Sequence, residues 1–353
     1  MPNAFKFKDI IVAAAAVLYC GFLPAAAQQQ TEVAVVYSYL PGEWQSGLRD
    51  GIEATLTAFG KKVKLTDFVF DSDGWAARPA ADKLKEKNRL LGQLSASKYT
   101  YVIVCDDEAA DLVIPGLKSD KSKKIFFTGV NRSEKELTWL KGRPANVSGI
   151  MERFQVPETL EMLRMFDKDI KSLSILTSGT KSSLVIMEDV AARIREQSAG
   201  SPKAVTLRKT YALSTWQEWQ DAIADIAAND QALWLLVPYG VAGPGGKEVP
   251  VTMIGEYLRK NLSIPTLGII SVHTKIGVLV AISVSPYDLG VAVAEQVARS
   301  LNGEEQRAIG VYPLRKSRLE INLQEAERLN VAIPEKLKGI ATIVNLRDLP
   351  MQR

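Results

Sequence analysis

Short apolar runs rich in β-branched residues alternate along this chain with longer segments whose apolar residues recur at helical spacing. The runs are bounded by turn residues, and they have the length and composition of buried strands. The first group of expected strands comprises Val33–Tyr37, Lys64–Phe70, Tyr101–Cys105 and Lys124–Thr128. The second group comprises Ser172–Leu176, Val205–Tyr211, Leu233–Val237, Thr266–Ser271, Val278–Ser283 and Glu320–Leu323.

The segments between these runs are amphipathic and predict helices. Tyr287–Leu301 is followed by Asn302-Gly303, a common helix stop signal. The other expected helices are Gly47–Phe59, Ala80–Leu94, Ala109–Leu117, Pro157–Phe166, Ser182–Gln197, Thr215–Ala228, Val251–Lys260 and Glu325–Asn330. Strands that alternate with helices in this way predict parallel sheets with crossover helices.

The strand–helix series restarts after residues 146–151, so we expect two units of similar size. The predicted fold class is α/β, with two doubly wound, Rossmann-like lobes. Chain crossings between the lobes are expected near residues 148–151, 281–285 and 312–318.

The N-terminus has the pattern of a secretory signal peptide. Lys6 and Lys8 precede the uncharged run Ile10–Leu23, which is followed by Pro24-Ala-Ala-Ala27. The alternative is a membrane anchor, but this run is shorter than the roughly 20 apolar residues that cross a bilayer. Cys20-Gly21 suggests a lipoprotein site, yet Tyr19 stands where a small residue is required. We therefore expect a signal peptide over residues 1–27, cleavage near Ala27 and export to the periplasm.

Composition and charge exclude several classes of function. The sequence holds 44 basic and 40 acidic residues without a concentrated basic block, which argues against a nucleic-acid partner. Cys105 is the one cysteine beyond the leader, and we expect it to pack as a small apolar side chain. His273 is the only histidine, and no G-x-S-x-G motif occurs. The expectation is a protein that is not an enzyme, with no catalytic residues, cofactor or metal.

The C-terminal segment Leu319-Glu-Ile-Asn322-Leu-Gln-Glu-Ala326-Glu-Arg-Leu329-Asn-Val-Ala-Ile333-Pro334 resembles the closing motif of a family of ABC transporter substrate-binding proteins. That motif runs roughly I-N-L-x-x-A-x-x-L-G-(I/V)-x-I-P, and Asn330 replaces its glycine. Asn146-Val-Ser-Gly149-Ile, Pro157-Glu-x-Leu160 and Ser285-Pro-Tyr287-Asp-Leu-Gly290 are similar to further family segments in the same order. Together the matching segments cover nearly the whole chain.

The resemblance implies the type I periplasmic binding protein fold, in which a small ligand is held between two lobes. The expected N-terminal lobe is 28–148 plus 282–314, and the expected C-terminal lobe is 149–281 plus 315–353. The implied function is an exported, monomeric solute-binding protein. It would capture a small polar or aromatic ligand in the cleft between the lobes and deliver it to an ABC permease.

A second resemblance implies an alternative. Asp106-Asp107-Glu-Ala109 and Phe126-Phe-Thr-Gly129-Val-Asn131 are similar to a related subgroup of periplasmic-binding-like sensors. Those proteins often form the sensing part of histidine kinases or cyclic-dinucleotide enzymes. The alternative function is therefore a stand-alone ligand-sensing subunit that acts through a separate membrane sensor protein.

Residues that follow the expected strands are the candidate ligand contacts, because ligands of open α/β sheets bind at the carboxyl ends of the strands. Some have structural alternatives, which are packing of Trp44 on its own helix, a cap by Asp107 on the next helix, and a turn at Thr180. A lone histidine such as His273 is more often structural. The candidates are Ser38, Tyr39, Trp44, Asp106, Asp107, Asn131, Ser178, Thr180, Tyr239, Ser271 and His273.

Overall fold

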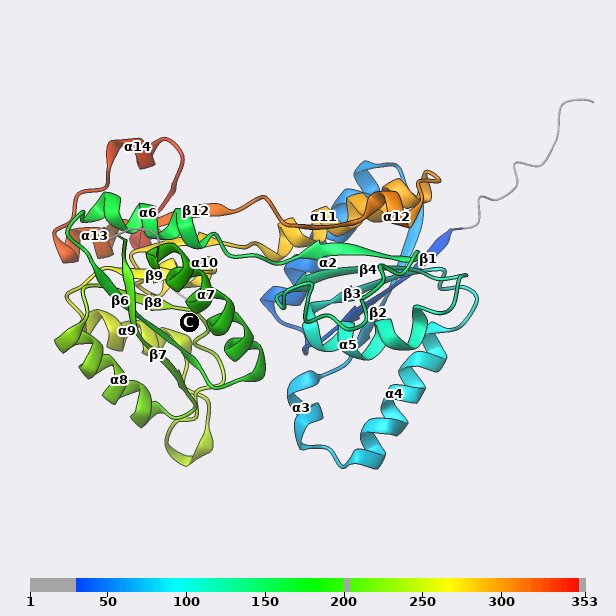
Figure 1. The fold of residues 1–353 in the computed structure, drawn as a ribbon, viewed down its shortest axis with the longest axis horizontal. Coiled ribbons are helices and arrows are strands. Elements are labelled where there is room, and N and C mark those ends of the chain that lie inside the picture. The colour runs from blue at the N-terminus through cyan, green and yellow to red at the C-terminus, as the bar shows by residue number, and fades with distance from the viewer. Residues whose placement is uncertain (1–29, 200–203, 349–353) are drawn as a thin grey trace, which may run out of the picture.

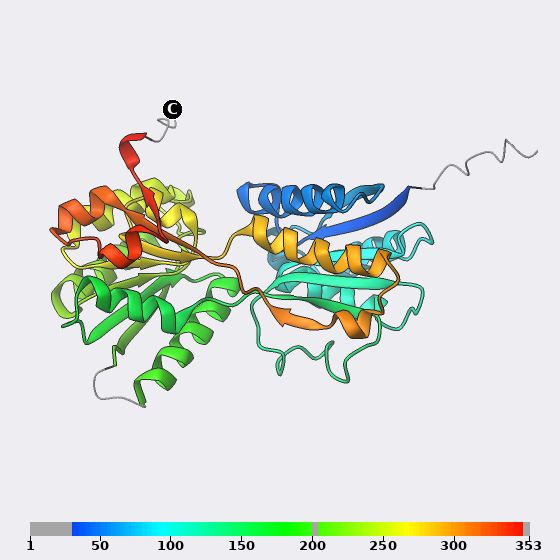
Figure 2. The ribbon, with the colours of Figure 1, turned by 90° about the horizontal axis from the view of Figure 1, so that it is seen from above.

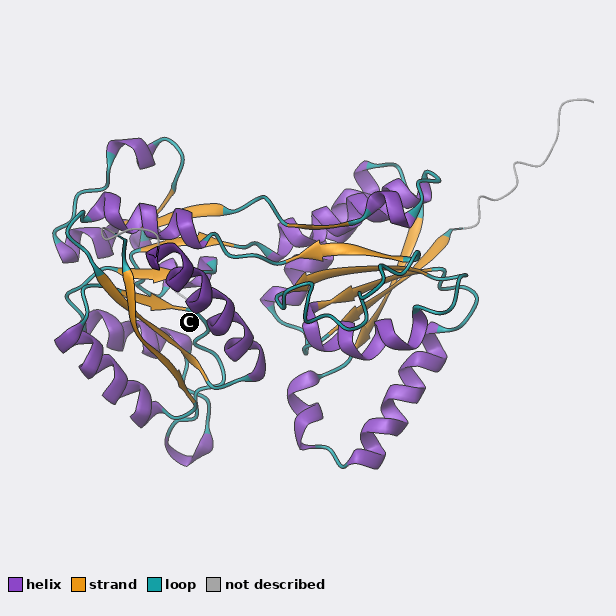
Figure 3. Ribbon diagram, viewed as in Figure 1, coloured by secondary structure: helices purple, strands orange, loops and turns teal. Residues whose placement is uncertain are grey.

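The chain folds into two α/β lobes that lie side by side and are joined by three connecting segments (Figure 1). The structure is a computed structural model that describes residues 30–199 and 204–348. The predicted signal peptide, its cleavage site at Ala27 and Cys20 lie outside the described residues. Within the described ranges, no helix combines the length and hydropathy needed to cross a bilayer. Each lobe consists of a sheet with helices on both faces, as the sequence predicts (Figure 3).

The first lobe contains a sheet of six strands that all run parallel. The strand order β11-β5-β4-β3-β1-β2 is that of a doubly wound sheet, with β4 and β3 in the middle and β1 between β3 and the edge strand β2. The strands are β1 (Thr31–Tyr37), β2 (Val63–Val69), β3 (Tyr101–Cys105), β4 (Lys124–Val130), β5 (Val147–Met151) and β11 (Val311–Pro313).

Apolar residues of the central strands are buried on both faces of this sheet. Val33 and Val35 pack with one helical layer, whereas Ala34 and Val36 pack with the other, since successive side chains of a strand point to opposite faces. The first layer is formed by α2 (Glu43–Ala58) and α11 (Pro286–Leu301), and the second by α4 (Ala80–Leu94) and α5 (Asp106–Leu117). The short helices of this lobe are α3 (Ser72–Ala77) and α12 (Gln306–Ile309).

Glycines bring α2 and α11 into close contact. A Cβ atom on Gly290 would lie 2.3 Å from the backbone oxygen of Leu48, and one on Gly51 would lie 2.2 Å from that of Tyr287. Backbone atoms cannot move aside as a flexible side chain can.

We therefore expect Gly290→Ala to lower the free energy of unfolding by about 1–3 kcal/mol, measured by urea denaturation. Gly92→Ala in α4 is the control, because open space surrounds Gly92. The free energy of unfolding of this variant should be unchanged or higher, since alanine is a better helix former than glycine.

The second lobe has a sheet of seven strands in the order β13-β12-β10-β9-β8-β6-β7. Its pairs are parallel except for β10 and β12, which run antiparallel. The strands are β6 (Ser172–Ser178), β7 (Thr206–Leu213), β8 (Leu233–Leu235), β9 (Thr266–Gly268), β10 (Val280–Ser283), β12 (Arg318–Asn322) and β13 (Thr342–Val344).

Helices also cover both faces of the second sheet. Buried residues of α6 (Val156–Phe166) and α7 (Lys181–Ala199) pack on one face, and those of α8 (Trp216–Asn229) and α9 (Val251–Asn261) on the other. Tryptophan residues of α8 are part of this second core, as the sequence favours. The remaining helices are α10 (Ser271–Lys275), α13 (Leu323–Leu329) and α14 (Glu335–Lys338).

Three segments connect the lobes, and Figure 2 shows them between the two sheets. They lie between β5 and α6 (152–155), between β10 and α11 (284–285) and between β11 and β12 (314–317). The first two crossings fall a few residues later than the predicted lobe limits at 148 and 281, because β5 and β10 each pair along their length within one sheet. The third includes the predicted limit at 314.

Candidate ligand-binding site

Polar side chains follow the parallel strands of the first lobe at the edge that ligands of such sheets occupy. Tyr39 follows β1, Asp106 follows β3, and Asn131 follows β4. Glu152 follows β5 directly, and it was not among the residues predicted from the sequence. Asn131 Nδ2 donates to Glu152 Oε2 at 3.2 Å, so residues that follow neighbouring strands meet at this edge.

Asp106 is a buried carboxylate with one oxygen that has no hydrogen-bond partner. Its Oδ1 accepts from Trp44 Nε1 at 3.2 Å, which draws Trp44 into the site, whereas Oδ2 has no partner among the described residues. The residue has a φ of 69°, and Gly129 leaves room for it, since a Cβ there would lie 2.6 Å from Asp106 Oδ1. Burial, assisted by the charge of Glu152, raises the pKa of Asp106 well above its usual range. A carboxylate in this state needs a donor or a cation.

Glu152 and Asn131 extend this arrangement of buried acceptors. Glu152 is 4% exposed, and burial raises its pKa to about 8, although the hydrogen bond from Asn131 opposes the shift. Asn131 Oδ1 is buried without a partner in the described part of the chain. We name Asp106, Asn131 and Glu152 the acceptor cluster. The cluster offers a ligand buried oxygen atoms, and a bound cation favours the negatively charged form of its two carboxyl groups.

Asp107 forms hydrogen bonds within the first lobe, and its predicted ligand contact stays a prediction. Its Oδ2 accepts from the backbone N–H of Asn131 at 2.8 Å, and its Oδ1 accepts from Arg132 Nε at 3.0 Å. These bonds fix the loop after β4 and hold Asn131 in place. The cap at the start of α5 comes instead from Ser38, whose Oγ accepts from the N–H of Ala109 at 2.9 Å.

Ser38 lies in the interior of the first lobe. It is fully buried, and its Oγ donates to the backbone oxygen of Cys105 at 2.7 Å while accepting from Ala109. Both hydrogen-bonding functions of this hydroxyl are thus occupied by the backbone around β3 and α5. Ser38 therefore positions Asp106, and we leave it out of the proposed ligand contacts.

The facing loops of the two lobes approach each other at Tyr39. Its hydroxyl donates to Glu108 Oε2 at 2.9 Å, and burial raises the pKa of Tyr39. Ser182 of α7 lowers the pKa of the same Tyr39 hydroxyl, and the positive charge of Lys181 lowers the pKa of Glu108, although burial outweighs both effects. Because Ser182 and Lys181 belong to the second lobe, the N-terminus of α7 faces the first lobe here.

Hydroxyl groups gather where β6 leads into α7. Ser178 Oγ lies 2.8 Å from Ser183 Oγ, and Thr180 Oγ1 hydrogen-bonds to the same Ser183 hydroxyl. Ser178 and Ser183 are fully buried, whereas Thr180 is partly exposed. The structure thus brings Ser178 and Thr180 together, and Thr180 and Ser182 are the members that lie nearer the surface.

The three remaining candidates have different environments. Tyr239 is 41% exposed, burial raises its pKa, and the charge of Glu43 across the lobes adds to this shift. Ser271 Oγ lies 3.3 Å from Ser283 Oγ beside the second crossing. His273 has no exposed surface, its Nδ1 accepts from the N–H of Ile269 at 3.2 Å, and burial lowers its pKa to about 3. His273 is therefore a neutral residue of the interior, and we leave it out of the proposed site.

The first-lobe side of the site is suited to a positively charged group. The acceptor cluster lies beside the carboxylates of Asp107 and Glu108, and the Arg132 guanidinium is paired with Asp107 and Asp111. In the described ranges, no three or more His, Cys, Asp and Glu side chains are placed to hold a metal ion. An ammonium or amidinium group with several N–H donors matches these acceptors.

Two doubly wound lobes, three crossings and polar residues at the carboxyl ends of the strands define a two-lobed binding protein of the type I periplasmic binding fold. A family model described as ABC transporter substrate binding protein matches residues 47–345. The chain belongs to this family, whose members bind substrates rather than transform them.

Solved structures support the same fold. An ABC domain in complex with L-Trp from Streptococcus pneumonia has a TM-score of 0.60 and 17% identity, over 88% of this chain and 99% of that one. A conserved domain protein from Vibrio cholerae has a TM-score of 0.63 and 19% identity, over 89% and 99%. A ligand-free, open substrate-binding protein with adhesive properties from Clostridium difficile has a TM-score of 0.66 and 14% identity, over 89% and 99%. A comparison with curated proteins finds no match.

Proposed function

We propose that this protein captures a small ligand with a positively charged amine between its lobes and delivers it to an ABC transporter. The observation that carries the proposal is the unpartnered, buried Oδ2 of Asp106 beside Glu152 and the equally unpartnered Oδ1 of Asn131. Leaving such atoms without partners costs free energy, which a ligand ammonium group recovers by donating to them.

The second lobe supports a ligand that also carries an acceptor or anionic end. Thr180 and Ser182 lie at the N-terminus of α7, where backbone N–H groups and the helix dipole favour negative charge, and Lys181 adds a positive charge. A zwitterion such as an amino acid satisfies both lobes at once. Tyr39 and Trp44 add aromatic surface for an apolar or aromatic side chain, and one similar structure holds L-Trp.

The mechanism is closure around the ligand. Groups from both lobes contact the ligand only when they approach each other, so the ligand stabilises the closed conformation, and the three crossings act as the hinge. A permease then recognises that conformation. We further propose that the protein is exported to the periplasm, with cleavage near Ala27, and acts as a monomer. The sensing alternative stays a prediction.

A thermal unfolding screen tests the proposed ligand class. The panel contains L-tryptophan and other amino acids, each paired with two analogues that lack either the α-ammonium or the carboxylate group. At about 100 times its Kd, the ligand should stabilise the protein by about 2.7 kcal/mol. We expect every compound without the ammonium group to be inactive. Stabilisation by neutral sugars or by the deaminated analogues would contradict the proposal.

A further inference from the structure

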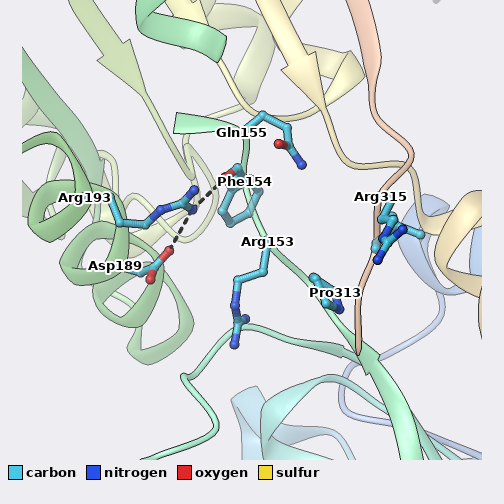
Figure 4. A pocket seen from close by; sticks show the side chains of 8 residues that line it. Arg153, Phe154, Gln155, Asp189, Arg193, Pro313 and Arg315 are labelled. Atoms are coloured by element: carbon cyan, nitrogen blue, oxygen red, sulfur yellow. Dashed lines mark hydrogen bonds and ion pairs between the residues drawn. The ribbon is translucent and has the colours of Figure 1, made fainter. Parts of the chain in front are cut away.

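A cavity of about 480 Å³ lies beside the first and third crossings, and its lining includes no residue of the acceptor cluster. Figure 4 shows Arg193 and Arg315 on opposite sides of this cavity, with Arg153 and Phe154 between them. Arg153 and Arg315 belong to the crossings, whereas Arg193 is on α7. Three arginines from three separate segments thus line one space.

Negative charge around this hinge cavity does not balance the three arginines. Asp189 is the single carboxylate in the lining, and its Oδ2 lies 3.5 Å from Arg193 Nη1. Arg153 donates only to backbone oxygens, among them those of Asn131 at 2.8 Å and Arg132 at 2.8 Å. Carbonyl oxygens satisfy N–H groups without cancelling the charge. The charges of Asp107 and Glu152 act on Arg153 from outside the lining, and the lining itself holds three arginines and one carboxylate.

Arg315 is free to bind a ligand. The neighbouring cations of the third crossing are paired with the buried Asp288, with Lys316 Nζ at 2.7 Å and Arg318 Nε at 3.0 Å. Arg315 is exposed and has no hydrogen bond or ion pair within the described part of the chain. Its guanidinium can therefore move toward an occupant of the cavity at little cost.

The walls between the charges are apolar. Phe154 is 3% exposed and Leu314 is 6% exposed, and both line the cavity together with Pro313. We propose that the hinge cavity binds a small organic oxyanion, a compound with a phosphate or carboxylate group on a compact apolar body. Guanidinium groups form paired, charge-assisted hydrogen bonds with such oxyanions, and the apolar body packs on Phe154 and Leu314.

Calorimetric titration at constant ionic strength tests this site, with phenyl phosphate and inorganic phosphate as probes. We expect the purified protein to bind one phenyl phosphate, and to bind inorganic phosphate more weakly because it lacks the apolar body. Arg315→Gln should weaken phenyl phosphate binding about tenfold. Because Arg315 has no partner, this variant should unfold at the same temperature as the wild type. Arg193→Gln should weaken binding by at least as much.

Three variants separate this site from other cationic positions. Arg307→Gln changes an exposed arginine of α12, and Lys181→Gln changes the N-terminus of α7. Asp106→Asn changes the amine site. All three should bind phenyl phosphate as the wild type does. The inference is overturned by wild-type protein that shows no saturable binding of either probe, by Arg315→Gln and Arg193→Gln variants that bind normally, or by lost binding in Lys181→Gln.

Discussion

Replacing Asp106 by asparagine should strongly weaken binding of the amine without weakening the fold. The substitution removes the negative charge that faces the ligand, and loss of one member of a buried charge pair costs about 2–5 kcal/mol. We therefore expect the affinity for the active amino acid to fall at least about thirtyfold. Asparagine tolerates the φ of 69° and can accept the bond from Trp44 Nε1, so the local geometry is kept.

Calorimetric titration of the same variant measures its affinity, and urea denaturation measures its free energy of unfolding. The free energy of unfolding of Asp106→Asn should equal or exceed that of the wild type, because a buried carboxylate with an unpartnered oxygen is costly. Asp50→Asn is the control, since Asp50 is an exposed residue of α2 in the same lobe. Unchanged affinity in Asp106→Asn would remove the acceptor cluster from the ligand site.

Replacing Glu152 by glutamine should change how stability depends on pH. The folded-state pKa of Glu152 is about 8, above the ordinary value of 4.5 that applies when the chain is unfolded. Between these values the folded protein retains a proton that the unfolded chain has released. Stability therefore falls as the pH rises through this window, by up to about 1.4 kcal/mol per pH unit.

Glutamine carries no ionisable group, so the variant lacks this contribution. We expect Glu152→Gln to be several kcal/mol more stable than the wild type at pH 8, with a smaller difference at pH 5. Its side-chain oxygen can still accept from Asn131. Urea denaturation at pH 5, 6.5 and 8 measures the effect, with the exposed Glu161→Gln of α6 as control. The prediction would be contradicted if the free energies of unfolding of Glu152→Gln and of the wild type changed in parallel with pH.

The same shift links ligand binding to protons. An ammonium group favours the ionised carboxylate, so its binding releases the proton that Glu152, with a pKa of about 8, holds in the free protein. Affinity for an amine should therefore increase between pH 6 and 8, and Glu152→Gln should lose part of this increase. The free energy that destabilises the empty site is thus recovered when the ligand binds.

The fold follows closely from the sequence, because its signals are local. Tyr101–Cys105 and Ala80–Leu94 have the bounds that the pattern predicts, since a buried parallel strand and an amphipathic helix each show their period within one segment. Ser271 shows where this fails. It was expected to end a strand, but β9 ends at Gly268 and Ser271 begins the short helix α10. In this turn the side chain of the buried His273 accepts from the N–H of Ile269.

The candidate site was only partly predictable. Asp106 and Asn131 were predicted as ligand contacts because they follow apolar runs, and Glu152 has the same relation to Val147–Met151. That run was interpreted as a lobe boundary, so the acid after it was missed. Ser38 shows the reverse case, since its position after β1 predicted a ligand contact, while the backbone of Cys105 and Ala109 occupies its hydroxyl.

By itself the sequence determined the fold class, the two-lobed order of strands and helices, and the family, because periodicity and ordered motifs are properties of the linear chain. Only the tertiary structure decided which polar groups have partners. Asp106 and Asp107 are neighbours in the sequence, yet Asp107 is paired with Arg132, whereas Asp106 Oδ2 has no partner in residues 30–199 and 204–348. Burial and pairing depend on residues that are distant along the chain, and they set both the charge of the amine site and the excess of arginine at the hinge.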